Sequence, residues 1–490
     1  MKRKKYSLSH YRLTSFNQGE LVPLSLIEVL PGDTVQQKTS AMLRVSPLIR
    51  PVMHPVHVTL HHWYVPFRIL WEKWEEFITQ ANLDSGLSFP TLTFKDGVPS
   101  GSLADHLGVP IQSPGAEIVV SAIPFRAYHK IWNEFYRDQD LQTEISVSLD
   151  SGNTDVSAPA ASPRRVNWVK DLFTTARPWE QKGDDVRIPV STEVGIHVKE
   201  FGANRAILAD LVPSTSGNNV TANLKTRSGA NMATNRPDIM TGPPGTINDL
   251  RKAFSMQKYQ EARARYGSRY VEYLKYLGVR SSDARLQRPE YLGGSRDPVQ
   301  FSEVLQTAPG DNDSETDTVG ALKGHGIGAM KTRRWRRFFE EHGYIMTLAH
   351  VKPIPVYTSS LHRHWSKRLP EDFYQKELAH IGSQAIRLHE LYNPGDGSVS
   401  PNETFGYADR YYEYREHYSS VSGKFRPGSA NVNWHMARSF ASKPVLNSDF
   451  ITCTPTDRIY ADKTVDQIQL MAKHSIQARR MVARGNTRGV

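Results

Sequence analysis

Eighteen histidines are the first residues in this sequence whose chemistry could define a site. His57 and His61 lie four residues apart, a spacing at which two imidazoles on one helix can bind a single metal ion. The surrounding segment VMHPVHVTLHHWYVP (52–66) alternates apolar and polar residues, which predicts a half-buried strand instead, and a strand separates the two rings by roughly 13 Å. No HExxH motif occurs, so we predict no histidine metal site.

The acidic segment DNDSETD (311–317) begins like a calcium-binding loop. Such a loop needs a glycine at its sixth position and a bidentate glutamate at its twelfth, where this chain has Thr316 and Leu322. We interpret the segment as a solvated acidic loop, with a weak cation site as the alternative.

The sequence lacks the common signatures of nucleophilic and phosphate-transfer chemistry. It has neither a phosphate-cradling P-loop nor a G-x-S-x-G nucleophile elbow. GHGIGA (324–329) has three glycines at the wrong spacing for a nucleotide fingerprint, and we interpret it as a flexible hinge in a loop. The one cysteine, Cys453, lies in FITCTPTD with nothing to activate it, which favours a small buried side chain. We therefore predict no catalytic residue, no cofactor and no enzymatic activity.

Basic residues offer a different chemistry, because Lys and Arg neutralise phosphates without reading base sequence and interleaved aromatic rings can stack on unpaired bases. They cluster at the start of the chain, in KTRRWRRFF (331–339) and in the tail QARRMVARGNTRGV. The two ends carry no acid, which is typical of mobile arms with few competing partners. The predicted nucleic-acid contacts are Lys2, Arg3, Lys4, Lys5, Arg479, Arg480, Arg484 and Arg488. The alternative is that these basic ends bind neighbouring protein subunits.

Composition bounds the class of protein that must position these residues. The 490 residues are 39% hydrophobic and 23% charged, which excludes a wholly disordered chain. No segment approaches the ~20 apolar residues of a membrane span, and a single cysteine excludes an internal disulfide. Thirty prolines, 33 glycines and 10% aromatic residues indicate a turn-rich β protein with large packing surfaces. The formal net charge of +11 permits a polyanionic partner without requiring one.

Hydrophobic periodicity predicts short strands separated by helices and long loops. The predicted strands cover 31–46, 52–66, 115–125, 188–200 and 343–358, and the predicted helices cover 67–78, 127–136, 246–277 and 372–382. The polar segment 201–245 has no period, and neither does 283–298. A structureless loop as long as 201–245 inside a compact domain is uncommon and usually functional.

Several segments together resemble the major capsid proteins of the Microviridae, small icosahedral phages with circular single-stranded DNA, and most closely the gokushovirus-like branch. The resemblance covers nearly the whole chain in family order, and DARLQRPEYLGGSR is its most specific segment. The matching segments are FNQGELVPL (16–24), LPGDT (30–34), IPFRAYHKIWNEFYRDQDLQ (123–142), RPWEQKG (177–183), TINDLRKAF (246–254), SSDARLQRPEYLGGSRDP (281–298), EHGYIMTLAHV (341–351), FYQKELAHIGSQA (373–385), FGYADRYYEYR (405–415) and LNSDFI (446–451).

The resemblance implies an all-β-dominated fold, a single eight-stranded antiparallel jelly roll with long, partly helical insertions. It implies a major capsid protein that self-assembles into a T = 1 icosahedral shell around circular single-stranded DNA in the virion, after assembly in the host cytoplasm. Internal scaffolding, pilot and small DNA-binding proteins of the phage are further implied partners, and membrane insertion is not expected. From the residues alone, a non-shell protein that coats single-stranded nucleic acid is the alternative.

The expected organisation is a basic N-terminal arm (1–20) followed by a jelly-roll capsid domain (21–490) that ends in a basic tail (471–490). Within that domain we expect a surface insertion loop (201–245), then a helix with an intersubunit loop (246–300). The mix of charge, tyrosine and paired glycines in 281–298 indicates turns held by charge-assisted hydrogen bonds at a contact between subunits. The residues predicted to make that contact are Arg285, Arg288, Glu290, Tyr291 and Arg296. The alternative is a loop satisfied within its own chain.

Overall fold

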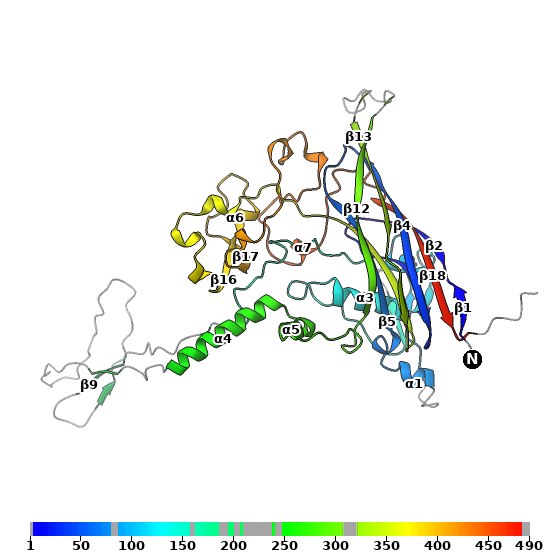
Figure 1. The fold of residues 1–490 in the computed structure, drawn as a ribbon, viewed down its shortest axis with the longest axis horizontal. Coiled ribbons are helices and arrows are strands. Elements are labelled where there is room, and N and C mark those ends of the chain that lie inside the picture. Colours follow the sequence, from blue (N-terminus) through cyan, green and yellow to red (C-terminus); the bar gives the residue numbers. More distant parts are fainter. Residues whose placement is uncertain are drawn as a thin grey trace, which may run out of the picture. The chain divides into compact units, whose positions relative to one another are not determined.

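Long antiparallel strands dominate the chain, with few helices (Figure 1). The computed structural model describes residues 3–79, 87–156, 162–184, 186, 195–199, 206–208, 238–240, 247–305, 307, 320 and 322–482. The chain divides into two compact units, one formed by residues 1–180 with 267–490 and the other by residues 181–266. The first unit contains the large sheet and nearly all of the described core, so the all-β-dominated expectation is confirmed.

The large sheet contains ten strands among the described residues, in the order β1-β18-β4-β13-β12-β5-β15-β3, with β2 also paired to β18 and β14 to β4. Every neighbouring pair is antiparallel. Its strands are β1 (Lys4–Ser7), β2 (His10–Phe16), β3 (Val22–Val29), β4 (Thr34–Leu48), β5 (Val56–Pro66), β12 (Glu290–Leu305), β13 (Leu322–Lys331), β14 (Trp335–Phe338), β15 (Gly343–Pro353) and β18 (Ile468–Arg480).

The sheet curls so that its two halves face each other across one hydrophobic core (Figure 1). Leu43 of β4 and Leu470 of β18 enter this core from one half, and Leu60 of β5 and Val351 of β15 enter it from the other. The long strand β12 joins the halves, because its first part pairs with β5 and its last part pairs with β13. Burial of these apolar faces against each other is the main stabilising contribution to the sandwich.

One outward side of the sandwich lies under a helix. The helix α3 (Ile123–Phe135) presents Tyr128, Ile131 and Trp132 to the cluster formed by Trp63 of β5 and Leu348 of β15. Pro124 stands in the first turn, where its missing N–H costs nothing, so the helix begins earlier than the predicted residue 127. Strand β5 is therefore buried on both faces, and the prediction of a half-buried strand was wrong.

The remaining elements are short. The other helices of the described residues are α1 (Trp74–Thr79), α2 (Leu103–Leu107), α4 (Ile247–Tyr266), α5 (Tyr270–Tyr276), α6 (Leu388–Leu391) and α7 (Ser448–Ile451). Three small sheets pair β6 (Thr91–Phe94) with β7 (Ile118–Ser121) and β8 (Asn153–Val156), β9 (Gly195–Lys199) with β10 (Ala206–Leu208) and β11 (Asp238–Met240), and β16 (Ser383–Arg387) with β17 (Thr404–Asp409). The 3₁₀ turns are η1 (Phe67–Ile69), η2 (Arg363–Ser366), η3 (Pro370–Asp372), η4 (Lys376–Leu378), η5 (Tyr412–Tyr414), η6 (Gly423–Phe425) and η7 (Val432–Trp434).

Two predicted helices differ in the structure. The predicted helix 246–277 is interrupted between α4 and α5 because Gly267 adopts a φ of +89°, a left-handed conformation that ends a helix. The predicted helix 372–382 is wrong, since that segment contains only the 3₁₀ turns η3 and η4. Its DFYQKELAHIG pattern buries too little apolar surface to stabilise a helix.

Three segments predicted as loops or arms are strands. Within the N-terminal arm, residues 4–7 and 10–16 pair with β18, so they are not mobile. GHGIGA is part of β13 and is not a hinge, because a Cβ on Gly326 would lie 2.7 Å from Val45 Cγ2 on the neighbouring strand. The last part of 283–298 belongs to β12 and pairs with β5. In each case pairing with a distant strand, rather than local period, decides the structure.

Candidate nucleic-acid interface

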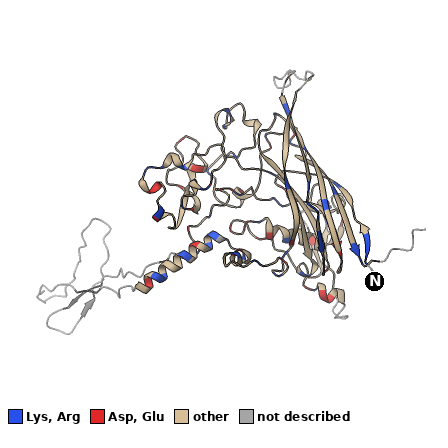
Figure 2. Ribbon diagram, in the orientation of Figure 1, with Lys and Arg blue, Asp and Glu red and all other residues tan. Residues whose placement is uncertain are grey.

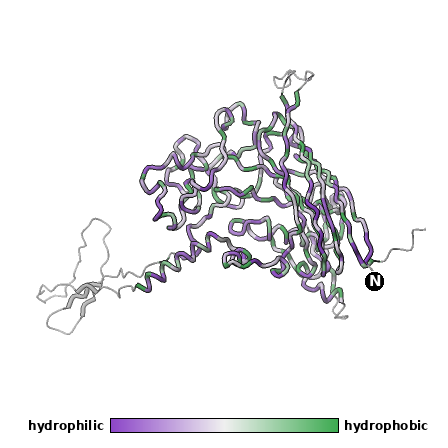
Figure 3. Tube along the Cα trace, viewed as in Figure 1, coloured by the Kyte–Doolittle hydropathy of each residue, from purple (hydrophilic) through white to green (hydrophobic). Residues whose placement is uncertain are grey.

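The outward side of the other half of the sandwich has no helix over it, and we call it the open face. It is formed by the outward positions of β1, β2, β18, β4, β13 and β14. Along β18 every second residue from Gln469 to Arg479 is exposed while the residues between them are buried. The register then sets which neighbours share the side, since Lys473 lies opposite Ser40 of β4 and Tyr11 of β2. Burial accordingly alternates along β4 and β18. Figure 3 shows hydrophobic and hydrophilic positions interspersed along the strands of the large sheet.

The open face is strongly basic. Figure 2 shows Lys and Arg along β4, β18 and β1. Its strand positions contain no Asp or Glu, and seven of its cations form no ion pair with a residue that the structure describes. These seven cations are Lys5, Lys38, Arg44, Lys331, Arg336, Lys473 and Arg479.

Neighbouring cations on this face, Lys38 and Lys331, repel each other. Contact with Lys331 lowers the pKa of Lys38, and the charge of Arg334 in the link between β13 and β14 contributes to the shift. Cations that repel one another and lack carboxylate partners attract a polyanion, because each phosphate they contact relieves the repulsion and releases bound counterions. The arrangement can therefore neutralise a nucleic-acid backbone, and it provides no hydrogen-bonding pattern specific to one base sequence.

Aromatic rings stand among these cations. Tyr11 is 59% exposed and Phe338 is 49% exposed. The Lys473 ammonium lies 5.3 Å from the centroid of the Tyr11 ring, and the Arg3 guanidinium lies 5.4 Å from that of Phe338. Exposed rings beside cations are the combination that binds unpaired bases, whereas a duplex keeps its bases stacked inside.

The structure divides the predicted nucleic-acid contacts into four groups. Lys2, Arg484 and Arg488 lie outside the described residues. Lys5 and Arg479 are neighbours in register on the open face, so the two chain ends are brought together there. Arg3 is exposed at its edge and donates to the carbonyl of Gly32 at 3.2 Å. Lys4 and Arg480 pair one register step away and project from the opposite side.

Arg480 is neutralised within the chain. Its Nε lies 2.9 Å from Oδ2 of Asp33, and it also donates to the carbonyl of Glu28. Asp33 is fully buried, which raises the pKa of its carboxyl, while the backbone N–H of Leu30 and the Arg480 charge oppose that shift. Arg479 and Arg480 are adjacent in sequence, yet only Arg479 faces solvent without a partner among the described residues.

Sequence reasoning missed most of the open face. Lys38, Arg44 and Lys473 each stand alone among uncharged neighbours, so they form no cluster in the sequence. The signal that could have found them is the alternation in TVQQKTSAMLRVS (34–46) and QLMAKHSIQARR (469–480), where every second position is polar or basic except at Met42 and Met471. That pattern indicates a basic strand face, but only the register joins the strands into one surface.

The five predicted intersubunit residues occupy different environments. Arg285 and Arg296 are exposed. Arg288 binds Asp283 through Nη2 at 2.6 Å, and Glu290 forms an ion pair with Arg337. Tyr291 is 48% exposed and packs on Trp63 with ring centroids 5.0 Å apart. These in-chain contacts fix the backbone of 283–291 and leave Arg285, Tyr291 and Arg296 accessible.

Metal chemistry finds no support among the described residues, which contain no group of three or more His, Cys, Asp or Glu side chains placed to hold an ion. The acidic segment 311–317 lies outside those residues. His61 accepts or donates a bond to the Tyr136 hydroxyl at 2.7 Å, and burial lowers the pKa of His61 to about 4. His61 and its neighbour His350 are neutral packing residues under α3.

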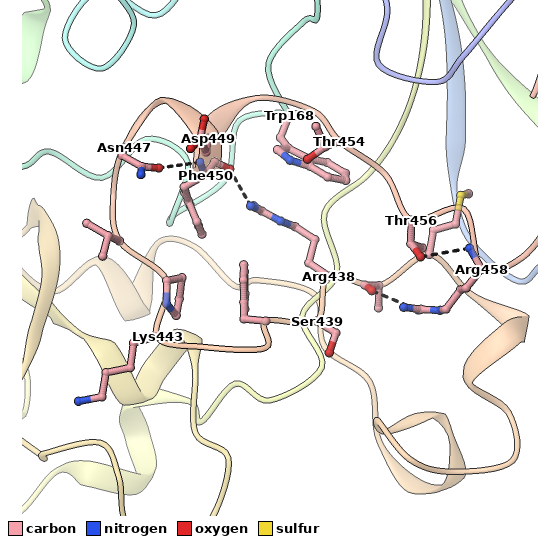
Figure 4. A pocket seen from close by; sticks show the side chains of 15 residues that line it. Trp168, Arg438, Ser439, Lys443, Asn447, Asp449, Phe450, Thr454, Thr456 and Arg458 are labelled. Carbon is pink, nitrogen blue, oxygen red and sulfur yellow. Dashed lines mark hydrogen bonds between the residues drawn. The ribbon is translucent and has the colours of Figure 1, made fainter. Parts of the chain in front are cut away.

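A cavity of about 490 Å³ lies beside α7 (Figure 4). Arg438 donates through Nη2 to the carbonyl of Phe450 at 2.6 Å, and its guanidinium lies 4.2 Å from the centroid of that ring. Arg458 donates to the carbonyl of Ala437, and Lys443 is paired with Glu403. The side chains that line the cavity include no histidine or cysteine.

The described helices include none whose length and apolar content would let it cross a membrane.

Comparisons with known proteins agree over the full length. Residues 1–487 match the family described as capsid protein (F protein). The chain is 34% identical to capsid protein VP1 of Bdellovibrio phage phiMH2K, over 93% of this chain and 89% of that protein. It is 31% identical to capsid protein VP1 of Chlamydia phage 1, over 94% and 91% of the two chains. For capsid protein VP1 of Spiroplasma virus 4 the identity is 30%, over 92% and 87%.

Proposed function

The chain belongs to the capsid protein (F protein) family of the Microviridae and is a major capsid protein, and from this premise we propose that its copies form a closed T = 1 icosahedral shell around single-stranded DNA. The full-length family match is the observation that carries the proposal. In this proposal the protein has no catalytic role, and it assembles in the host cytoplasm before it becomes part of the virion.

We propose that the core of the subunit is an eight-stranded jelly roll. The large sheet has eight strand positions, because β1 and β2 both occupy the edge beside β18, and β13 and β14 share the place beside β4. Two packed antiparallel halves with long excursions between strands are typical of that fold. The excursion at 201–245 is proposed as an outer-surface insertion, and most of it lies outside the described residues.

We propose that the open face lines the inside of the shell and binds the packaged DNA. Seven cations without carboxylates, together with Tyr11 and Phe338, support this role. Neighbouring copies are then expected to meet elsewhere, and Arg285, Tyr291 and Arg296 remain proposed contacts. The proposal does not require DNA contacts from the other five predicted residues, which are Lys2, Lys4, Arg480, Arg484 and Arg488.

Electron microscopy of purified particles tests the shell, because a protein that only coats nucleic acid gives filaments or irregular complexes instead of closed icosahedra. For the DNA role, the triple variant Lys38→Gln/Arg44→Gln/Lys473→Gln is compared with the wild-type subunit for binding to an unstructured oligonucleotide. Loss of three phosphate contacts is expected to reduce the slope of log affinity against log salt by about 2, at roughly 0.7 per contact on single strands.

The matched control is Lys170→Gln/Lys424→Gln/Arg426→Gln, which removes three exposed cations of the same unit that are not on the strands of the open face. It is expected to bind nearly as the wild type does. Equal salt slopes for the two triple variants would contradict the DNA role of the open face while leaving the shell proposal intact.

A further inference from the structure

Large apolar side chains are exposed together on the segment around η2, η3 and η4, and we call them the aromatic patch. Trp365 is 65% exposed and Leu369 is 61% exposed. More than half of the surface of each remaining member is also exposed. The patch consists of Trp365, Leu369, Phe373, Tyr374 and Tyr414.

Contacts within the unit join Phe373, Tyr374 and Tyr414 into one surface, and Trp365 and Leu369 belong to the same segment. The Lys367 ammonium lies 4.1 Å from the centroid of the Tyr414 ring and 5.4 Å from that of Phe373. Tyr374 lies 6.3 Å from Tyr414 between ring centroids. Lys367 therefore lies beneath the two rings, and its alkyl stem and charge hold them side by side.

The backbone below the patch is rigidly held. Lys367 forms an ion pair with Glu413 at 2.9 Å, and the two side chains are only 6% and 5% exposed, respectively. Asp372 accepts bonds from the backbone N–H groups of Arg368 and Leu369 at 2.8 and 2.9 Å, and these bonds lower the pKa of its carboxyl. A segment fixed in this way presents its rings to solvent without the entropy cost of ordering them at the moment of binding.

A second group of contacts, which is buried, holds the start of η2. Arg363 binds Glu390, which is completely buried, at 3.1 Å, and its Nη1 also lies 3.1 Å from the hydroxyl of Tyr412. Tyr412 in turn donates to Glu390. Removing a member of such a buried network is strongly destabilising because it leaves the others without partners, so the network fixes the start of η2 in one position.

The area of the patch is at the upper end of the range for the largest apolar patch on a monomeric protein, and such patches are often functional. Aromatic side chains bury 150–250 Å² each, so five large side chains that are more than half exposed present about 600 Å² of surface. A standard protein interface buries about 800 Å² on each partner. The patch and its immediate polar rim therefore match one side of a stable interface.

The charges around the patch indicate what kind of partner covers it. The exposed rim contains Arg368 and Lys376 together with Glu371 and Glu377, two charges of each sign. A balanced rim does not attract a polyanion, in contrast to the open face, and instead suits a protein surface with its own mixed charges. Trp, Tyr and Arg are also the residue types that dominate binding energy in protein interfaces.

We propose that the aromatic patch is a contact between subunits, covered in the assembled particle by a second copy of this chain. The proposal rests on the proposed shell, in which every copy is surrounded by identical neighbours. Phe373 and Tyr374 at its centre become buried on assembly, and Trp365 and Leu369 extend the contact along one side.

Photo-crosslinking in purified particles tests the proposal directly. A photoreactive benzoylphenylalanine at position 373 keeps an aromatic, apolar side chain in the patch. Irradiated particles are expected to yield a species of twice the chain's mass, and mass spectrometry of the crosslink is expected to find a peptide of this same chain. A mixture of isotopically light and heavy copies makes links between two copies distinguishable from links within one.

A crosslink to another phage protein, or no crosslink in intact particles, would overturn the proposal. Closed particles seen by electron microscopy in the same preparation would keep the shell itself established, so the two failures are distinguishable. Absence of particles from the wild-type protein would instead contradict the proposed shell.

Thiol labelling gives a second measurement that does not depend on photochemistry. Cys453 is fully buried and burial raises its pKa to about 12, so the native thiol does not react. Tyr374→Cys is expected to be labelled by a maleimide rapidly in free subunits and at least tenfold more slowly in particles. Equal rates in the two states would overturn the proposal.

A charge in the patch is expected to prevent assembly without unfolding the subunit. Phe373→Asp should leave the subunit folded, as circular dichroism would report, and reduce particle yield at least tenfold. The matched control is Ile111→Asp, which places the same charge at a side chain that is 59% exposed outside the patch. Normal particle yield from Phe373→Asp would overturn the proposal.

Discussion

The outward side of the β sandwich that lies under α3, which we call the covered face, differs from the open face in what its residues contact. On the covered face, Trp63 of β5 is 4% exposed and packs against Phe135 of α3 with ring centroids 4.1 Å apart. On the open face, Tyr11 of β2 is 59% exposed with a cation at its ring. The same strand geometry therefore provides stability on one side and a binding surface on the other.

This difference predicts which mutations change the stability of the subunit and which change its binding. Side chains of the covered face contribute to folding, because they fill space between the sheet and α3. Side chains of the open face contribute little to folding, because no other element of the described chain packs on them. The predictions below test this division, from the largest expected change in stability to the smallest.

Removing the central ring of the covered face should have the largest effect. Trp63→Ala is expected to lower the free energy of unfolding of the subunit by about 4 kcal/mol, because it leaves a cavity that the rigid sheet cannot close. Chemical denaturation measures the change. Tyr11→Ala removes a ring of similar size from the open face as the matched control and should change the same quantity by less than about 0.5 kcal/mol. Comparable losses in the two variants would contradict the division.

Acid should destabilise the protein through the covered face. Burial lowers the pKa of His61 to about 4, with the Lys352 charge adding, whereas an unfolded histidine titrates near 6.5. Between these values the unfolded state binds more protons, so the stability contributed by the neutral ring is present above pH 6.5 and is lost as the pH falls toward 4. The loss is about 3 kcal/mol for this one group.

Unfolding midpoints measured in denaturant from pH 7.5 to 4.5 check this expectation. His61→Gln, a side chain that does not titrate, should flatten the dependence in that range. The control is His364→Gln, at an exposed position. An unchanged slope in the His61 variant would mean that other groups determine the acid sensitivity.

Two adjacent arginines sharpen the comparison. Arg480→Gln should lower the free energy of unfolding by about 2 kcal/mol, because the buried carboxylate of Asp33 loses its charged partner. Arg479→Gln should change it by less than about 0.5 kcal/mol and should instead weaken binding to single-stranded DNA at low salt. Thermal unfolding and oligonucleotide binding on both variants measure the two effects, and an exchange of roles between them would refute the assigned register.

Apolar residues of the open face should matter least to folding. Met471 is 43% exposed and lies opposite Met42 in register. Met471→Thr keeps a strand-favouring residue at this position and should leave the unfolding midpoint unchanged within about 0.5 kcal/mol. The matched core change five residues further along, Ile476→Thr on the inward side of the same strand, should cost several times more.

The sequence by itself determined the class of the fold and the family. The residue types of 31–46 and 343–358 predicted strands that the structure contains as β4 and β15, because runs rich in strand-favouring residues next to turn signals are a local property of the sequence. The excess of basic residues was likewise a property of the sequence alone. The family resemblance rested on ten ordered segments and agrees with the full-length match.

Tertiary structure alone decided which residues act together. The open face joins β1 and β18, which lie at opposite ends of the chain, and no local pattern predicts that Lys5 meets Arg479. The direction of a side chain alternates at each residue of a strand. Arg479 is therefore exposed, whereas Arg480, the next residue, forms an ion pair with the buried Asp33. Segment 290–298 became a strand for the same reason, since β5 supplied the hydrogen bonds that its own sequence could not specify.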